Sequence, residues 1–146
     1  MSAESLEILL VEDNPDDIEL TVHAFNRHHL SNRLQICRDG AEALDYLFGR
    51  GAYEGRNVDN IPKVVLLDLK LPKLGGIEVL AAIRGDPRTR AIPVVILTSS
   101  REDRDLAECY RLGANSYIVK PVDFEQFTDA VREVGLYWLL LNQAPR

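Results

Sequence analysis

Short runs of branched apolar residues alternate along the chain with segments in which apolar residues recur at spacings of three and four. An apolar run of about four to eight residues bounded by turn-forming residues predicts a buried strand, whereas the three–four spacing predicts an amphipathic helix. We therefore predict strands at residues 6–11, 34–37, 63–68, 93–98 and 116–121. The segments that follow these strands are predicted to contain helices.

The alternation of strands and helices predicts the fold class. It is typical of an α/β protein in which a parallel sheet carries helices on both faces, with right-handed crossovers between the strands. A length of 146 residues suits one domain, which can bury a sizeable core without disulfides. We expect a single domain over residues 1–146.

Local signals predict several helix boundaries and faces. Asn14 suits a helix cap, and Pro15 suits the first helical position. A later helix is expected to turn its apolar residues inward, namely Leu106, Cys109 and Tyr110.

Two further segments are predicted to lack regular structure. Asp39-Gly40 is predicted to be a turn. Residues 49–62 are rich in Gly, Asn and Arg and have no periodicity, so we expect a long loop. A functional loop and a tolerated insertion are both compatible with this composition.

Four of the five predicted strands end in side chains suited to chemistry: Glu12-Asp13, Asp68, Thr98 and Lys120. The carboxyl ends of parallel strands meet at one edge of the sheet, where ligands bind and neighbouring strands lie about 4.8 Å apart. A carboxylate at the end of a buried strand is costly unless it is paired or binds a metal. Taken alone, Asp68 is equally compatible with a residue that turns the chain. The joint occurrence favours a shared site.

The residue types at these strand ends indicate phosphoryl chemistry. Three carboxylates in one pocket, Glu12, Asp13 and Asp68, raise one another's pKa unless a cation lies among them. Oxygen ligands without His or Cys suit Mg²⁺ or Mn²⁺. Lys120 suits a phosphoryl oxygen, and Thr98 offers a hydroxyl donor. Together these groups are the parts needed to phosphorylate an aspartate.

Composition limits the kinds of partner and the compartment that we expect. The net charge is −6 and no basic run occurs, which argues against a nucleic-acid partner. Cys37 and Cys109 lie far apart without metal-binding spacing, so we expect both to pack as small apolar residues. Residues 1–5 lack the basic segment of a signal peptide, and no apolar stretch approaches a membrane span. We expect a cytoplasmic protein with no membrane partner.

The pattern resembles the receiver domains of two-component response regulators. The resemblance covers roughly residues 6–134 and depends on Glu12-Asp13, Asp68, Thr98 and Lys120-Pro121, each after a predicted strand. It implies a flavodoxin-like, doubly wound sheet of five parallel strands in the order 2-1-3-4-5, flanked by five helices, an order known for other receiver proteins. It also implies a cis peptide bond between Lys120 and Pro121.

The resemblance assigns the acidic residues to acceptor and metal roles. It implies that Asp68 accepts a phosphoryl group from the phosphohistidine of a sensor kinase. It also implies that Mg²⁺ binds Asp13, Asp68 and the backbone carbonyl of Lys70, and that Glu12 acts largely through water. We therefore expect a signalling switch that performs only its own phosphoryl transfer and autodephosphorylation.

The resemblance also implies a switch. Thr98 and Lys120 would hold the phosphoryl oxygens, and the small Ser99 would leave the approach open. Thr98 would move toward the phosphoryl group, and Tyr117 would then turn inward. From the residue alone, Tyr117 is better explained as a strand residue with its hydroxyl at the surface. A bias of a few kcal/mol between two states is enough for such a switch.

The last predicted helix ends in a strongly apolar segment. One stripe of this segment can continue inward, so its other apolar side chains need cover. We expect residues 135–146 to extend the last helix and to form a homodimer interface that includes Leu136, Trp138, Leu139 and Leu140. The alternative is that the segment folds back on its own domain.

The apolar end and the loop at 50–62 resemble the stand-alone regulators that serve bacterial phytochromes. This resemblance implies a phytochrome-type sensor histidine kinase as partner. No output domain is expected after Arg146, so the signal should leave through a surface.

Three other functions fit parts of the pattern. A phosphatase with Asp68 as nucleophile usually needs an acid two residues later, where this chain has Lys70. A nucleotide-binding domain needs a glycine motif after a strand, and neither G-x-G-x-x-G nor a P-loop occurs there. A module that binds partners without phosphorylation has no need of the complete set of Asp68, Thr98 and Lys120.

Overall fold

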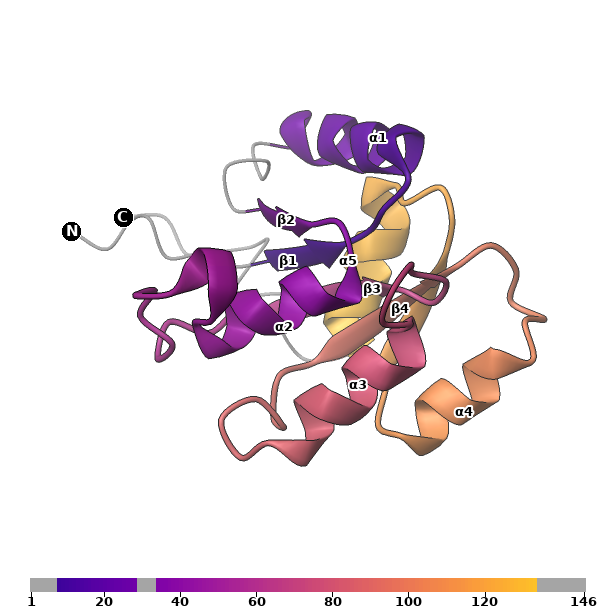
Figure 1. Ribbon diagram of the computed structural model, residues 1–146. Helices are drawn as coiled ribbons and strands as arrows, with labels where there is room; N and C mark the ends of the chain where they lie inside the picture. Colours follow the sequence, from indigo (N-terminus) through magenta and orange to yellow (C-terminus); the bar gives the residue numbers. More distant parts are fainter. Residues whose placement is uncertain (1–7, 29–33, 134–146) are drawn as a thin grey trace.

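The computed structural model describes residues 8–28 and 34–133, in which strands and helices alternate (Figure 1). The strands are β1 (Ile8–Val11), β2 (Leu34–Cys37), β3 (Val64–Asp68), β4 (Val94–Thr98) and β5 (Ser116–Val119). The helices are α1 (Pro15–Asn26), α2 (Gly40–Phe48), α3 (Gly76–Gly85), α4 (Asp105–Arg111) and α5 (Phe124–Glu133), with a short 3-10 helix, η2 (Gly51–Tyr53), after α2. The predicted α/β class is confirmed.

The strands form one parallel sheet in the order β2-β1-β3-β4-β5, as the resemblance implied. β1 lies beside β3 at the centre, with Ile8 opposite Val64 and Val11 opposite Leu67. The chain leaves β1 toward β2 and leaves β3 toward β4. The connections after these two strands therefore diverge, which opens a crevice at their carboxyl ends.

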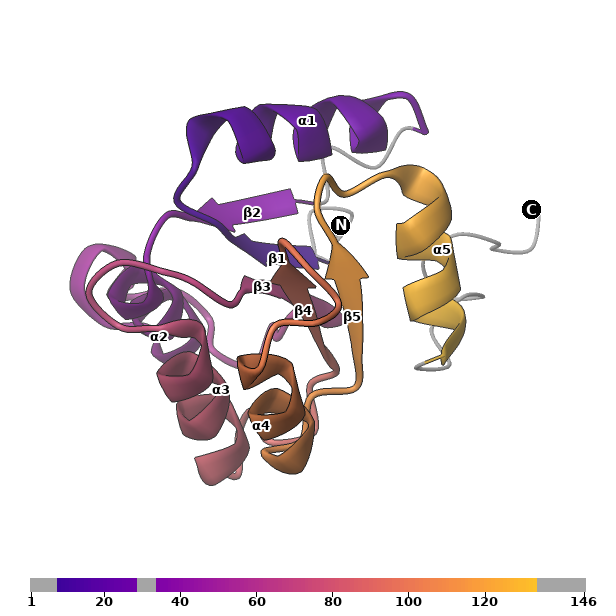
Figure 2. The same cartoon turned by 90° about the vertical axis from the view of Figure 1, so that its right-hand side faces the viewer.

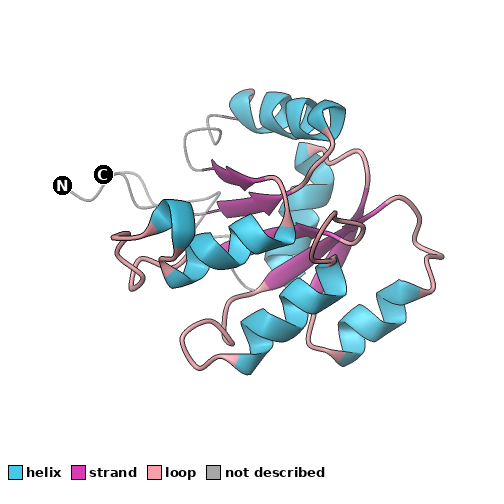
Figure 3. Ribbon diagram, in the orientation of Figure 1, coloured by secondary structure: helices cyan, strands magenta, loops and turns pink. Residues whose placement is uncertain are grey.

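Helices cover both faces of the sheet. α1 and α5 lie on one face, and α2, α3 and α4 lie on the other (Figure 2), so the strands form a middle layer between helices (Figure 3). Side chains of β1 alternate between the faces: Leu9 packs in the cluster under α2 and α3, whereas Leu10 packs with Phe25 of α1 and Phe127 of α5. Every residue of β1, β3 and β4 is buried, which explains their continuous apolar sequence.

Two helix starts show how local sequence fixes the chain. Asn14 caps α1, as predicted, because its side-chain oxygen accepts hydrogen bonds from the backbone N–H groups of Asp16 and Asp17. Asp39 also acts as a cap, accepting a hydrogen bond from the backbone of Glu42 at 2.7 Å. The prediction of a simple turn at Asp39-Gly40 was therefore incomplete, since Gly40 already belongs to α2.

The loop predicted at 49–62 contains structure that its composition did not reveal. η2 occupies its first part. The Arg56 guanidinium donates to the backbone carbonyls of Tyr46 at 2.6 Å and Asn60 at 3.0 Å, and it lies 4.1 Å from the centre of the Tyr46 ring. The Tyr53 hydroxyl donates to Glu42 at 2.6 Å. These contacts hold the segment against α2.

The predicted faces of α4 are partly correct. Leu106 and Cys109 are buried, but Tyr110 is 44% exposed and contacts Tyr117 edge-on at 6.4 Å between ring centres. Adjacent helical residues do not share a face, so Tyr110 cannot point inward with Cys109. Both cysteines are fully buried, as expected.

Two expectations concern the membrane and the end of the chain. Among the described residues, no helix combines the length and the apolar character that crossing a bilayer requires. The predicted dimer segment 135–146, with Leu136, Trp138, Leu139 and Leu140, lies outside the described residues.

Candidate functional site

A cavity of about 250 Å³ lies at the carboxyl ends of the central strands. It is lined by Glu12, Asp13, Asn14, Asp17, Asp68, Lys70, Thr98, Ser99 and Lys120. The structure thus brings together all the predicted acceptor, metal and phosphoryl-binding residues. Residues distant in the sequence meet here because the parallel strands all end at the same edge of the sheet.

The three predicted acids form a compact oxygen cluster. Glu12, Asp13 and Asp68 each offer a carboxylate oxygen, and these oxygens lie within 4.8 Å of one another. Glu12 and Asp68 are almost fully buried, whereas Asp13 is exposed at the mouth. A set of hard oxygen donors that is open on one side suits Mg²⁺, which typically keeps several waters and takes one or two carboxylates.

The pKa of Glu12 is raised by its burial and by the neighbouring acid. Burial, and then the negative charge of Asp68, raise the pKa of Glu12 from 4.5 to about 7. The backbone N–H of Asn14 and the ammonium of Lys120 act in the opposite direction but do not cancel this shift. A proton or a metal cation therefore stabilises the cluster near neutral pH.

Lys120 supplies the positive charge of the site. Its Nζ lies 3.1 Å from Glu12 Oε1, 3.0 Å from Asp17 Oδ2 and 3.3 Å from Asp68 Oδ1. Burial alone would lower the pKa of Lys120, but the hydrogen bond to Asp17 and the charges of Asp68 and Glu12 outweigh burial and hold that pKa above its usual value. The Lys120-Pro121 peptide bond is cis, as the resemblance implied.

Asp17 was not predicted to belong to the site. Its sequence position in the first turn of α1 explains it as a residue that favours the positive helix end. The available signal was its distance from the strand end, because one helical turn after Asp13 returns the chain toward the same edge.

Thr98 is buried and uses its hydroxyl locally. Its Oγ1 donates to the backbone carbonyl of Ser100 at 2.9 Å and accepts from the Ser100 N–H at 3.3 Å. Ser99 is exposed at the mouth of the cavity, so no bulky side chain stands there. The hydroxyl of Thr98 must exchange a bond within its own loop before it can donate to a ligand.

The side chain of Lys70 pairs with acids outside the cluster of Glu12, Asp13 and Asp68. Its ammonium lies 3.8 Å from Asp103 and 3.5 Å from Asp105 at the start of α4, and the side chain is mostly exposed. Its backbone N–H donates to Asp68 Oδ1 at 3.3 Å. Lys70 therefore contacts the Asp68 carboxylate through its backbone.

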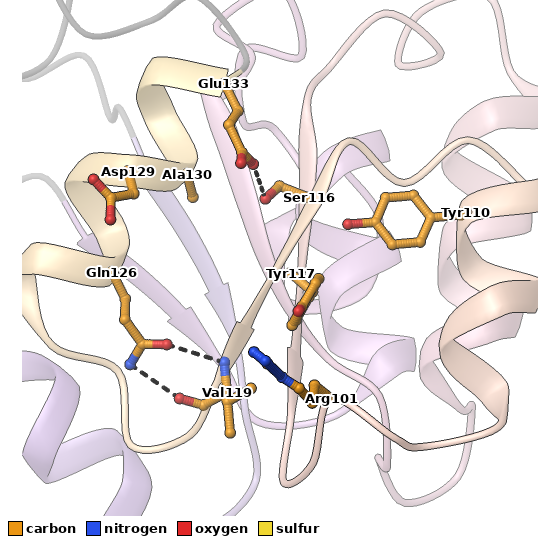
Figure 4. A pocket seen from close by; sticks show the side chains of 9 residues that line it. All are labelled: Arg101, Tyr110, Ser116, Tyr117, Val119, Gln126, Asp129, Ala130 and Glu133. Carbon is orange, nitrogen blue, oxygen red and sulfur yellow. Dashed lines mark hydrogen bonds between the residues drawn. The ribbon is translucent and has the colours of Figure 1, made fainter.

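A second cavity, of about 290 Å³, contains the predicted switch residue. Tyr117 and Tyr110 line it with Arg101 and residues of α5 (Figure 4). Tyr117 is half-buried there and does not line the acidic cavity. The α5 side of this cavity is fixed by Gln126, whose amide donates to the Val119 carbonyl at 3.0 Å and accepts from the Val119 N–H at 3.2 Å.

Comparison with known proteins matches this architecture. The model of the response regulator receiver domain family matches residues 8–132. The chain belongs to the response regulator receiver family. Receiver domains are signalling switches, and a hard divalent cation suits the acidic pocket of this one.

Similar receivers come from different pathways. The chain is 46% identical over 138 residues to the probable methanogenesis regulatory protein FilR2 of Methanothrix harundinacea, covering 94% of this chain and 86% of FilR2. It is 53% identical to the bacteriophytochrome response regulator AtBRR, whose solved structure superposes with a TM-score of 0.85 over 96% of this chain and 99% of AtBRR. The receiver therefore lies close to phytochrome response regulators in sequence and fold.

Two further solved receivers are a metal-bound form and a phosphorylated form. The Mn²⁺-bound form of the response regulator Rcp1 is 35% identical, with a TM-score of 0.73, and the match covers 97% of this chain and 99% of Rcp1. The phosphorylated cyanobacterial phytochrome response regulator RcpA is 38% identical, with a TM-score of 0.74 and the same coverage.

Proposed function

We propose that this receiver accepts a phosphoryl group on Asp68 from the phosphohistidine of a sensor kinase. The observation that carries the proposal is the position of Asp68: its buried carboxylate lies among two further acids and 3.3 Å from the Lys120 ammonium. A carboxylate already carries the charge of a nucleophile, so the site needs no general base.

The proposed transfer makes one bond and breaks one bond. An Asp68 oxygen attacks phosphorus and forms a P–O bond, the P–N bond of the phosphohistidine breaks, and its electron pair stays on the imidazole nitrogen. Lys120 faces the acceptor carboxylate and would pair with an oxygen of the transferred group. Thr98 would donate to a second oxygen after leaving the Ser100 carbonyl, and Ser99 would leave the approach open.

Mg²⁺, or Mn²⁺, fits the oxygen cluster of Glu12, Asp13 and Asp68, with the backbone carbonyl of Lys70 as a further ligand. When bound, the cation neutralises the negative charge that accumulates on the phosphoryl oxygens. The description of Rcp1 in a Mn²⁺-bound form supports this choice of metal.

We also propose the wider setting of the switch. The likeness to AtBRR and RcpA supports a phytochrome-type kinase in the cytoplasm as partner.

We propose that residues 1–146 form one domain and that Tyr117 follows Thr98 on phosphorylation. We also propose that the apolar segment 135–146 forms a homodimer interface. Sedimentation of a chain truncated after Gly135 tests the interface, since a truncated chain that remains dimeric would contradict it.

Incubation with acetyl phosphate and Mg²⁺ tests the central proposal. The expected result is a mass increase of about 80 Da, roughly one phosphoryl group, that is absent in Asp68→Asn and absent when EDTA replaces Mg²⁺. Asp16→Asn serves as a matched control, because Asp16 is exposed on α1 and does not line the cavity. Steady release of phosphate without a stable adduct would favour a phosphatase, and no reaction would favour a binding module.

A further inference from the structure

Lys120 has three carboxylate neighbours, and one of them is unexplained by the metal and acceptor roles. Asp17 Oδ2 accepts a hydrogen bond from Lys120 Nζ at 3.0 Å, which is shorter than the contacts of that ammonium with Glu12 and Asp68. Asp17 comes from a helix, whereas the other two acids follow strands. The contact therefore joins α1 to the loop after β5.

The backbone of Asp17 is held firmly in the first turn of α1. Its N–H donates to the side chain of Asn14 at 3.1 Å, and its carbonyl accepts from the hydroxyl of Thr21 at 2.8 Å. The N–H of Asn14 in turn donates to Glu12 Oε2 at 3.2 Å. The two acids that hold the ammonium, Glu12 and Asp17, are thus linked to each other through one short segment.

The geometry of an ammonium gives this arrangement a consequence. Lys120 has three N–H donors in a tetrahedral array. One donates to Glu12 and one donates to Asp17, so the ammonium cannot rotate freely. On the Asp68 side the contact is an ion pair, with Oδ1 3.3 Å from Nζ, while the hydrogen bonds of the ammonium go to Glu12 and Asp17. A phosphoryl group on Asp68 would add its oxygens on that side.

We infer that Asp17 is a positioning residue for phosphoryl transfer to Asp68, because together with Glu12 it holds the Lys120 ammonium beside the acceptor. The inference depends on the proposed function, since it assigns Asp17 a part in that reaction. Asp17 acts through Lys120 and needs no contact with the metal or with phosphorus. It extends the site beyond the strand ends to α1.

Three variants separate positioning from a general effect of charge. Asp17→Ala removes the acceptor, and Asp17→Asn keeps an acceptor oxygen without the charge. Asp16→Ala is the matched control, because it removes an acid from the same helical turn but does not line the cavity. With acetyl phosphate at saturating Mg²⁺, we expect Asp17→Ala to gain the phosphoryl group about tenfold more slowly, because a misplaced group is costly in the transition state. We expect Asp17→Asn to recover most of the rate and Asp16→Ala to match the parent chain.

A second readout needs no phosphorylation. The ¹⁵N signal of the Lys120 ammonium should be sharp in the parent chain and in Asp16→Ala, because a held ammonium exchanges its protons slowly. It should broaden or vanish in Asp17→Ala. An unchanged signal, or a transfer rate equal to that of Asp16→Ala, overturns the role of Asp17 and leaves the proposed function intact. A parent chain that gains no phosphoryl group overturns both. Should Asp17→Ala fail to fold, the same comparisons are made with Asp17→Ser, whose hydroxyl is too short to reach the Lys120 ammonium.

Discussion

The Lys120 ammonium lies 3.3 Å from Oδ1 of Asp68, and it is also within hydrogen-bonding distance of Glu12 and Asp17. One largely buried cation therefore balances several acids that would otherwise repel each other. The stability of the fold and the chemistry of the site depend on the same group.

Replacing Lys120 by Ala should separate these two contributions. We expect the free energy of unfolding to fall by about 3 kcal/mol in EDTA, because removing one partner of a buried ion pair leaves uncompensated charge. Mg²⁺ should restore part of the loss by supplying another cation. Urea unfolding with and without Mg²⁺ measures both effects. Arg111→Ala removes only an exposed pair with Glu108 and should change stability far less, and equal losses in the two variants would contradict the prediction.

The raised pKa of Glu12 predicts how stability depends on pH. Between pH 4.5 and about 7, folded Glu12 holds a proton that the unfolded chain has released. The contribution of Glu12 to stability is thus complete below pH 4.5 and is lost as pH rises toward 7. In EDTA, the melting temperature of the parent chain should fall across this range more steeply than that of Glu12→Gln.

Magnesium should bind better on the alkaline side of that range. Metal ligands must be deprotonated, so protons compete with the cation for Glu12. We expect Mg²⁺ affinity, measured by calorimetry, to be higher at about pH 8 than at about pH 6. An affinity that is the same at both values, or equal slopes for the parent chain and Glu12→Gln in the melting experiment, would show that Glu12 titrates elsewhere.

The glycine pair at the start of α3 provides a test of how the end of β3 is supported. A methyl group on Gly76 would lie 2.5 Å from the backbone oxygen of Asp68 and 2.9 Å from the Cα of Leu69. Gly76→Ala should therefore lose about 2 to 3 kcal/mol of stability and slow phosphorylation, because α3 and the end of β3 must move apart. Gly75→Ala is the control, since its nearest neighbour would be the flexible Glu78 carboxylate at 3.6 Å. The difference in Tm and in transfer rate between the two variants decides the question.

Arg84 of α3 joins two connections, the one before β4 and the one before β5. Its guanidinium donates to the carbonyls of Gly113 and Ile92 at 2.7 Å each and to the side chain of Asn115 at 2.9 Å. Arg84→Ala should lower the free energy of unfolding by about 2 to 3 kcal/mol, because it removes the donors of the partly buried carbonyls of Gly113 and Ile92. Arg84→Lys should recover little, since an ammonium cannot span these acceptors. Arg88→Ala removes an exposed pair with Asp86 and a contact with the Phe48 ring, and it should change stability far less than Arg84→Ala, as chemical denaturation can show.

Much of the fold follows from local sequence. The apolar runs before Asp68 and Thr98 are buried on both sides, so their pattern identified them as strands without tertiary information. The order of the strands does not follow in this way. Which strand lies beside β1 depends on crossovers between distant segments, and only the resemblance to receivers indicated it.

The site residues at and just after the strand ends were predicted, whereas Asp17 on α1 was missed. Asp68 and Lys120 stand at strand ends, so topology brings them together. Asp17 follows Asp13 by one helical turn, but its contact with Lys120 also depends on where the fold places the loop after β5, which the spacing does not give. Arg56 likewise organises its loop through carbonyls contributed by α2 and by Asn60, and these contacts exist only after folding.

The pairing of Gln126 with the backbone of Val119 affects how readily molecules of this protein associate at high concentration. β5 is an edge strand of the sheet, and unpaired backbone groups on an edge strand can pair with a strand of another molecule. The amide of Gln126 already occupies both backbone groups of Val119, so an incoming strand must first displace it. At this position of β5, α5 thereby hinders the addition of a strand from another molecule.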